Sequence, residues 1–419
     1  MAGSFDLPAY HSTTSLPGYS SKLSDGEQLL EYTPHRPSYR RPSSVYIRKE
    51  GRTTVVLNNQ KEGTAVPQYG RQGTINGTIC FENSDNILEV IMEIQGTMDI
   101  FVSQAGYKSL TIFEVSYPLW SPLSPDERQT QSCPSQIAFS KTLHTTFNTE
   151  DGRTLPLPPT YSSPRLHLAG PQAMVSYELR IIIKCSRHPK LAAWTKTRRI
   201  SIPFQYVPRT RAHQPITSYS SFPSSIKSTP EEWHQTVVPI PDNQGREKLY
   251  GLLFLPGHRI YGLGDIIPFH VQLTGDTEAL QELLPSVRGS MSSSLDPRES
   301  SSRAPILDHA RIEVVLLRQV TVRYKLLKSW EDTVIGKGIM WWTFPEVSSK
   351  FEDRCCIDWD GELRCQEGIT VGGFDAGNIH VKDFLVLKII PTHFSCPVQT
   401  VRSTVPIRLV TDSFDGADF

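Results

Sequence analysis

Apolar and polar residues alternate along much of the chain after about residue 53. In residues 175–185 every second residue is apolar, and residues between them, such as Glu178 and Arg180, are charged. A period of two is typical of a strand with one buried face. The same alternation occurs in residues 53–57, 75–82, 88–94 and 200–206. These segments predict a first series of β-strands, which Pro208 ends.

A second series of apolar segments begins after a stretch of different composition. Residues 209–242 are crowded with Pro, Ser, Thr and His, which predicts a linker. The later strand segments are residues 249–255, 260–273, 312–327, 368–374, 381–390 and 405–409. The best helical pattern is short, residues 277–284, and Pro285 ends it. Strands without intervening helices predict an all-β fold of two antiparallel, immunoglobulin-like β-sandwich domains.

The predicted organisation follows these changes of composition. Residues 1–50 are rich in Ser, Pro, Tyr and Arg, so they predict a disordered arm. The first domain is predicted at 51–208, the linker at 209–242, the second domain at 243–412 and a tail at 413–419. A serine-rich loop, 285–305, is predicted inside the second domain. Its candidate phosphorylation sites, beside three arginines, are Ser292, Ser293, Ser294, Ser300, Ser301 and Ser302.

The charge and the cysteine content limit the cellular compartments and the classes of partner that we expect for this protein. The chain has 43 basic and 43 acidic residues, so its overall field does not favour nucleic acid or acidic membranes. The seven cysteines are scattered, and no apolar signal segment follows the first methionine. No apolar run reaches the roughly 18 to 20 residues that span a bilayer. We therefore expect a cytoplasmic protein, with local contacts at most to a membrane surface.

Motifs for catalysis are missing from the sequence, which predicts that the protein is not an enzyme. It has no Gly-x-Ser-x-Gly elbow, no Walker phosphate loop and no His-Glu-x-x-His pair. Cys355, Cys356 and Cys365 lie near two aspartates, but their spacing does not match zinc sites, and turn or core thiols are the favoured interpretation. Gly262 and Gly264 are interpreted as a turn, since no helix pattern follows them. We expect no metal and no cofactor.

Short proline and tyrosine elements recur in the arm. Leu7, Pro8 and Tyr10 form one, Leu16, Pro17 and Tyr19 form another, and Pro37 precedes Tyr39. A segment preordered towards polyproline II docks in an aromatic-lined groove at low entropic cost, and neighbouring copies raise the effective concentration. The alternative is chance recurrence in an arm of biased composition.

A complete Pro-Pro-x-Tyr pattern is formed by Pro158, Pro159 and Tyr161. It lies just ahead of the strongest predicted strand. We therefore expect a structural turn that hides Tyr161. Basic residues such as Arg48 and Lys49 are candidates for contact with acidic lipid or a phosphorylated tail, although solvated charge is the favoured interpretation.

Taken together, an ordered set of segments resembles the fungal branch of the arrestin-like proteins, the α-arrestins. The segments run in order from about residue 53 to 412, and the first domain matches better than the second. They are residues 73–80 (GTINGTIC), 88–94, 157–161 (LPPTY), 175–184, 204–209 (FQYVPR) and 405–412 (VPIRLVTD).

This resemblance implies an arrestin-type scaffold that binds plasma-membrane transporter or receptor tails. It also implies that proline-tyrosine motifs recruit the WW domains of a HECT-type ubiquitin ligase, so that cargo is ubiquitinated and internalised. Such a protein is cytoplasmic and is recruited to the plasma membrane or endosomes. The motifs here lie in the arm, whereas family members usually carry them after the second domain. Two alternatives remain open, a retromer-like endosomal sorting or coat subunit and an enzyme built on a β-sandwich.

Overall fold

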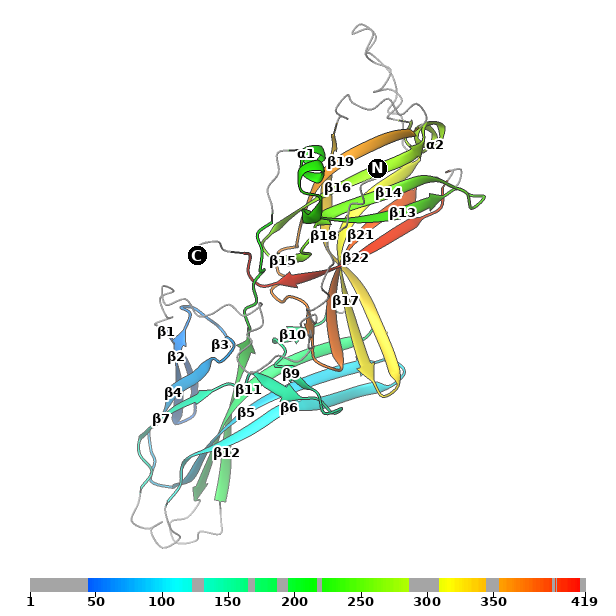
Figure 1. Ribbon diagram of the computed structural model, residues 1–419. Helices are drawn as coiled ribbons and strands as arrows, with labels where there is room; N and C mark the ends of the chain where they lie inside the picture. Colours follow the sequence, from blue (N-terminus) through cyan, green and yellow to red (C-terminus); the bar gives the residue numbers. More distant parts are fainter. Residues whose placement is uncertain are drawn as a thin grey trace, which may run out of the picture.

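The computed structural model describes residues 44–122, 132–164, 170–186, 195–216, 221–285, 309–343, 354–393, 396 and 398–414. The structure is mostly β, with strands paired in several antiparallel sheets (Figure 1). In the described residues, no helix is long or apolar enough to cross a membrane. The prediction of a disordered arm through residue 50 is wrong at its end. Residues 44–50 form an edge strand, because Tyr46 packs against the first core.

Two sheets packed face to face make up most of residues 44–206, which we call the first half, and β8 and β9 form a separate two-stranded sheet. The smaller sheet has the order β1-β2-β4-β7, and the larger has β3-β12-β11-β5-β6 with β10 paired to β11. Among the described residues of this half, β3 and β12 pair in parallel and the other strand pairs are antiparallel. Side chains of both sheets, such as Ile79 and Ile181, share one core. The bounds are β1 Ser44–Glu50, β2 Thr53–Gln60, β3 Gln68–Tyr69, β4 Thr74–Phe81, β5 Ile87–Val102, β6 Gly106–Trp120, β7 Gln136–Thr142, β8 Thr146–Asn148, β9 Thr154–Pro156, β10 Tyr161–Ser162, β11 Gln172–Ser186 and β12 Thr195–Tyr206.

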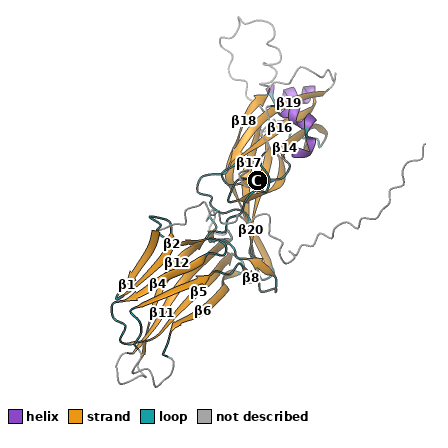
Figure 2. Ribbon diagram, turned by 60° about the vertical axis from the view of Figure 1, so that its left-hand side comes forward, coloured by secondary structure: helices purple, strands orange, loops and turns teal. Residues whose placement is uncertain are grey.

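One ten-stranded sheet makes up most of residues 222–410, the second half. Its order is β13-β14-β16-β19-β18-β17-β21-β22-β15, with β20 paired to β21. Leu253 of β14 and Leu387 of β21 share one core, so the sheet folds back on itself (Figure 2). The bounds are α1 Phe222–Ser228, η2 Pro230–Glu232, β13 Trp233–Pro241, β14 Glu247–Pro256, β15 Ile260–Gly262, β16 Ile266–Asp276, α2 Thr277–Leu283, β17 Ala310–Tyr324, β18 Leu327–Thr343, β19 Arg354–Arg364, β20 Phe374–Asp375, β21 Ile379–Pro391 and β22 Val401–Val410.

The two halves meet through the hairpin of β17 and β18, which runs alongside β5 of the first half (Figure 1). Val320 and Val322 of β17 are buried in the core of the first half, together with Ile379 and Val381 of β21. Residues that follow the predicted linker therefore complete the core that precedes it.

Several predicted elements are confirmed by the backbone. The alternating segments 175–185 and 200–206 lie in β11 and β12, and helix α2 ends just before Pro285, as its pattern indicates. The predicted linker, however, contains helix α1 and strand β13, which pairs with β14 along nearly its whole length. Strands β18 and β19 were not predicted, since their apolar residues do not alternate regularly.

Candidate functional site

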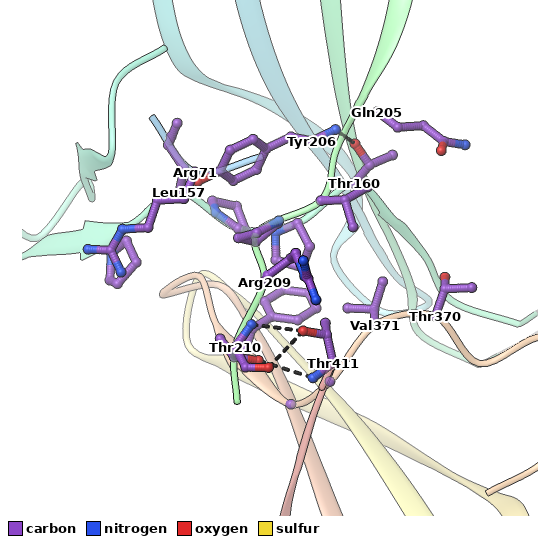
Figure 3. Close-up of a pocket in the computed structure, with 18 of the residues that line it drawn as sticks. Arg71, Leu157, Thr160, Gln205, Tyr206, Arg209, Thr210, Thr370, Val371 and Thr411 are labelled. Atoms are coloured by element: carbon purple, nitrogen blue, oxygen red, sulfur yellow. Dashed lines mark hydrogen bonds between the residues drawn. The ribbon is translucent and has the colours of Figure 1, made fainter. Parts of the chain in front are cut away.

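A cavity of about 560 Å³ lies where the first and second halves meet. Its lining comes from residues 155–160 and 205–210, from the 370–375 loop and from the end of β22. In Figure 3, Thr160 and Tyr206 lie on one side of this cavity, and Thr210 and Thr411 lie on the other. A volume of this size is within the usual range for small-molecule sites. We call it the junction cavity.

Hydrogen bonds between distant segments hold the cavity walls in place. The backbone N–H of Tyr206 donates to the Thr160 hydroxyl at 2.8 Å, and the N–H of Thr160 donates to the Tyr206 carbonyl at 2.9 Å. On the opposite wall the Thr411 hydroxyl accepts from the N–H of Thr210 and donates to its carbonyl, both at 2.8 Å (Figure 3). These bonds attach the segment after β12 to both halves at once.

Cationic side chains outnumber carboxylates in the cavity lining. Arg71, Arg209 and Arg408 line it, whereas the lining carboxylate is Asp375, which is 3.1 Å from His380. Arg209 forms a bidentate ion pair with Asp412 at the end of β22. Prolines, leucine, valine and threonines supply most of the remaining surface. The charge of Arg209 is thus already matched by a carboxylate, and the lining as a whole is a mixture of apolar and polar groups.

A buried ion pair joins β17 to β21 near the junction cavity. The Arg318 guanidinium donates to both oxygens of Asp383, at 2.7 and 3.1 Å, and both side chains are at most 5% exposed. Burial alone would lower the pKa of Arg318, but the hydrogen bonds and charge of Asp383 outweigh it and raise that pKa. The Arg318 guanidinium therefore stays charged at any ordinary pH.

Tyr161 is buried close to this ion pair. Its ring packs edge-on against Phe374, with the centroids 5.2 Å apart, and its hydroxyl has no hydrogen-bond partner among the described residues. Burial raises the pKa of Tyr161 to about 12, an effect that the positive charge of Arg318 partly opposes. The aromatic ring is thus part of the contact between the halves.

The Pro-Pro-x-Tyr pattern lies in this junction. Pro158, Pro159 and Tyr161 are all buried, and the Pro158 carbonyl accepts a hydrogen bond from the Tyr177 hydroxyl. A WW domain needs the proline ring and the tyrosine exposed. Burial therefore weighs against ligase binding at this motif and agrees with the structural turn expected from the sequence.

The other predicted site residues lie outside the described residues. These are the arm motifs, Leu7, Pro8, Tyr10, Leu16, Pro17 and Tyr19, and the loop serines, Ser292, Ser293, Ser294, Ser300, Ser301 and Ser302. Their roles stay predictions.

Strand β1 offers a second candidate surface. It is the edge strand of the smaller sheet in the first half, and its apolar residues Val45 and Ile47 are 46% and 59% exposed. The exposed Arg48 follows in the same strand. An exposed apolar edge strand is a template on which an extended peptide can add one more strand.

A second buried cluster of polar side chains, centred on His270, lies in the second half. His270 of β16 is 1% exposed, and its two ring nitrogens lie 2.8 Å from Asp360 and 3.0 Å from Asp358 of β19. Because the two carboxylates lie at opposite ends of the ring, the cluster does not converge on one point. Within the described ranges, no group of three or more His, Cys, Asp or Glu side chains is placed to hold a metal ion.

No family model matches this chain, and no curated protein matches it by sequence. The polar clusters therefore have to be interpreted from their own geometry. Sequence reasoning missed Arg318, Asp383 and His270, because each meets its partner only in the folded sheet. Arg318 and Asp383 are 65 positions apart, and His270 and Asp360 are 90 apart. A charged residue inside a strongly apolar strand, as Arg318 is in β17, was the one available signal.

Proposed function

We propose that the protein is a non-catalytic adaptor of the α-arrestin type. In this proposal the two halves are arrestin-like β-sandwich domains that bind the cytoplasmic tail of a plasma-membrane transporter or receptor. The proposed partner is a WW-domain HECT-type ubiquitin ligase, and the outcome is ubiquitination and endocytosis of the cargo. The proposed location is the cytoplasm, with recruitment to the plasma membrane or endosomes.

The observation that carries this proposal is the exposed apolar edge strand β1. Backbone groups along the edge give affinity to any extended tail, and alternate side-chain contacts at Val45 and Ile47 give selectivity. Arg48 adds attraction for acidic or phosphorylated segments. A surface of this kind suits capture of flexible tails.

Recruitment of the ligase rests on the arm motifs. The experiment is a fluorescence titration of the WW domains of a HECT-type ligase against the full-length protein. The variants are a triple Tyr10→Ala, Tyr19→Ala, Tyr39→Ala protein and a separate Tyr161→Ala protein. Micromolar binding that the triple variant loses and Tyr161→Ala keeps is the expected result. Failure of the unmutated protein to bind would remove the ligase from the proposal.

Cargo capture is tested separately with an array of cytoplasmic tail peptides from plasma-membrane transporters. Ile47→Lys places a charge on the exposed edge and should abolish the signals of the peptides that bind. Val237→Lys is the matched control, because Val237 is similarly exposed, at 55%, on the edge strand β13 of the second half. Equal loss in both variants would count against β1 as the tail site.

A retromer-like sorting or coat subunit is the second candidate function. It is favoured by the exposed apolar residues Ile339, Trp341 and Trp342 near the end of β18, which suit a lasting protein contact. Stoichiometric co-purification with one set of partner proteins, without WW binding, would favour this alternative.

A further inference from the structure

The tip of the β17–β18 hairpin, residues 323–330, carries exposed apolar side chains next to exposed basic side chains. Leu326 has a relative exposure of 103%, Trp330 is 58% exposed and Leu327 is 37% exposed. Arg323, Lys325 and Lys328 are also exposed. No carboxylate lies within ion-pair distance of these three cations in the part of the chain that the structure describes.

The stem below this tip is firmly held. Val320 and Val322 are buried in the core of the first half, and Tyr324 packs against the same core. The backbone N–H of Arg323 donates to the Asn378 carbonyl at 2.8 Å, and the Asn378 amide donates to the Arg323 carbonyl at 3.0 Å. The base of the tip is therefore fixed to the first half.

The turn at the hairpin tip has a lysine at a position where the backbone conformation favours a different residue type. Tyr324 and Leu327 pair across the hairpin, so Lys325 and Leu326 form a two-residue connection. Lys325 has a φ of 58°, a conformation that glycine or asparagine adopts more easily. Backbone preference therefore does not explain a lysine at this position, whereas a function of its positive charge would.

A second hairpin extends the same surface. Lys108, near the start of β6, lies with its ammonium 5.5 Å from the centroid of the Tyr324 ring, and the adjacent Tyr107 is 64% exposed. The nearby carboxylates have partners: Asp99 accepts from the Tyr107 hydroxyl at 2.6 Å, and Glu150 pairs with Lys108 at 2.7 Å. The yellow hairpin tip and the turn between β5 and β6 lie close together in Figure 1.

We propose that this hairpin tip docks on a membrane surface that contains anionic lipid. Leu326 and Leu327 would enter the boundary between headgroups and acyl chains, where Trp330 also partitions well. Lys325, Lys328 and Arg323 would contact the phosphates and carboxylates of the headgroups, with their aliphatic stems along the apolar layer. A convex apolar point with a cationic rim fits a lipid surface better than a protein groove that must match its shape. This inference is independent of ligase binding.

Sedimentation of the full chain with vesicles tests the proposal. Vesicles of phosphatidylcholine alone are compared with vesicles of phosphatidylcholine and phosphatidylserine, at low and high salt. We expect binding that requires phosphatidylserine and weakens with salt. Leu326→Ser with Leu327→Ser should weaken it roughly tenfold or more, because two apolar side chains are lost from the interface. Lys325→Gln with Lys328→Gln should weaken it by roughly fivefold for each charge removed.

Controls separate docking from general damage. Ile339→Ser removes an apolar side chain that is 72% exposed elsewhere on β18, and it should leave vesicle binding unchanged. Brominated lipid should quench the fluorescence of Trp330, and Trp330→Phe should remove that quenching. Thermal unfolding should be the same in all these variants, since the substituted side chains are exposed.

Two results would overturn the proposal. One is a lack of sedimentation with phosphatidylserine vesicles, which would leave the tip as a contact for another protein. The other is equal sedimentation of the unmutated protein and the double leucine variant, which would place lipid binding elsewhere on the chain. Neither result bears on the WW-domain titration, so the two proposals fail separately.

Discussion

Two of the buried charged clusters in the described part of the second half are built in opposite ways. Arg318 and Asp383 face each other directly across β17 and β21, close to the first half, and satisfy each other in a bidentate pair. His270 lies between two carboxylates of one neighbouring strand, far along the sheet, and helix α1 covers it. The Phe222 ring of α1 stacks on the imidazole with the centroids 3.7 Å apart.

The two clusters differ in whether their basic side chain changes its protonation state with pH. Arg318 keeps its charge at any ordinary pH, so its pair acts as a fixed link between strands at the junction. Burial alone would lower the pKa of His270, but hydrogen bonds and charges from Asp358 and Asp360 raise it above its usual value. The histidine cluster therefore responds to pH, whereas the arginine pair does not.

The largest effect is expected from breaking the arginine pair on one side. Arg318→Met leaves Asp383 buried without its partner, so unfolding free energy should fall by about 3–5 kcal/mol. Chemical denaturation measures it. Arg402→Met is the matched control, because it breaks an exposed ion pair to Asp332 and should cost less than about 1 kcal/mol.

Replacing both partners sharpens this result. Arg318→Met combined with Asp383→Leu leaves no unpaired buried charge, so most of the lost stability should return. A double variant as unstable as Arg318→Met alone would show that the pair is needed for more than mutual neutralisation.

The histidine cluster should produce a stability that depends on pH. A pKa raised in the folded state means that the contribution is fully present below the unfolded value of about 6.5 and is lost as pH rises through the folded pKa. Unfolding free energy should therefore decline as pH rises above about 6.5 and through the raised folded pKa. In His270→Gln that decline should disappear. An identical decline in both proteins would show that another group causes it.

The stacked phenyl ring should share this dependence. Phe222→Leu keeps an apolar side chain but removes the ring over the imidazolium, and we expect a loss of about 1 kcal/mol that is larger at acidic pH. Phe139→Leu, in the core of the first half, is the control. The unfolding free energy that this variant loses should not depend on pH. Chemical denaturation at two pH values makes the comparison.

The smallest effect concerns the junction tyrosine beside the arginine pair. The Tyr161 hydroxyl is buried without a partner among the described residues, so Tyr161→Phe should raise stability by a few tenths to about 1 kcal/mol. Tyr177→Phe is the matched control, because the Tyr177 hydroxyl donates to the Pro158 carbonyl and its removal should cost about 1 kcal/mol. Equal losses in both would mean that Tyr161 is hydrogen-bonded in solution.

How far the sequence predicts the fold depends on how evenly each strand is buried. Strand β11 buries alternate residues from Ala173 to Ile183, so its alternation in the sequence predicted it. Strand β18 changes its surroundings along its length, and its apolar residues Trp330, Ile339 and Trp341 stay exposed. No period-two pattern arises there. Strand β13 was hidden for another reason, since its prolines and histidine have the composition of a linker.

The candidate sites were less predictable, because a short sequence motif does not show whether its side chains are buried in the folded protein. The Pro158, Pro159 and Tyr161 pattern has the same letters whether it is exposed or packed, and only Phe374 and the neighbouring strands decide that. His270 and the hairpin leucines likewise gave no motif. The arm motifs at Tyr10 and Tyr19 and the predicted domain limits stay predictions.

The core shared across the junction has a consequence for synthesis on the ribosome. The first half is translated before β17 and β21, yet its apolar core is closed by Val320, Val322, Ile379 and Val381. Until residue 381 has left the exit tunnel, that core lacks part of its cover. We expect nascent chains stopped near residue 210 to be bound by chaperones, and a fragment with that end to aggregate when expressed alone.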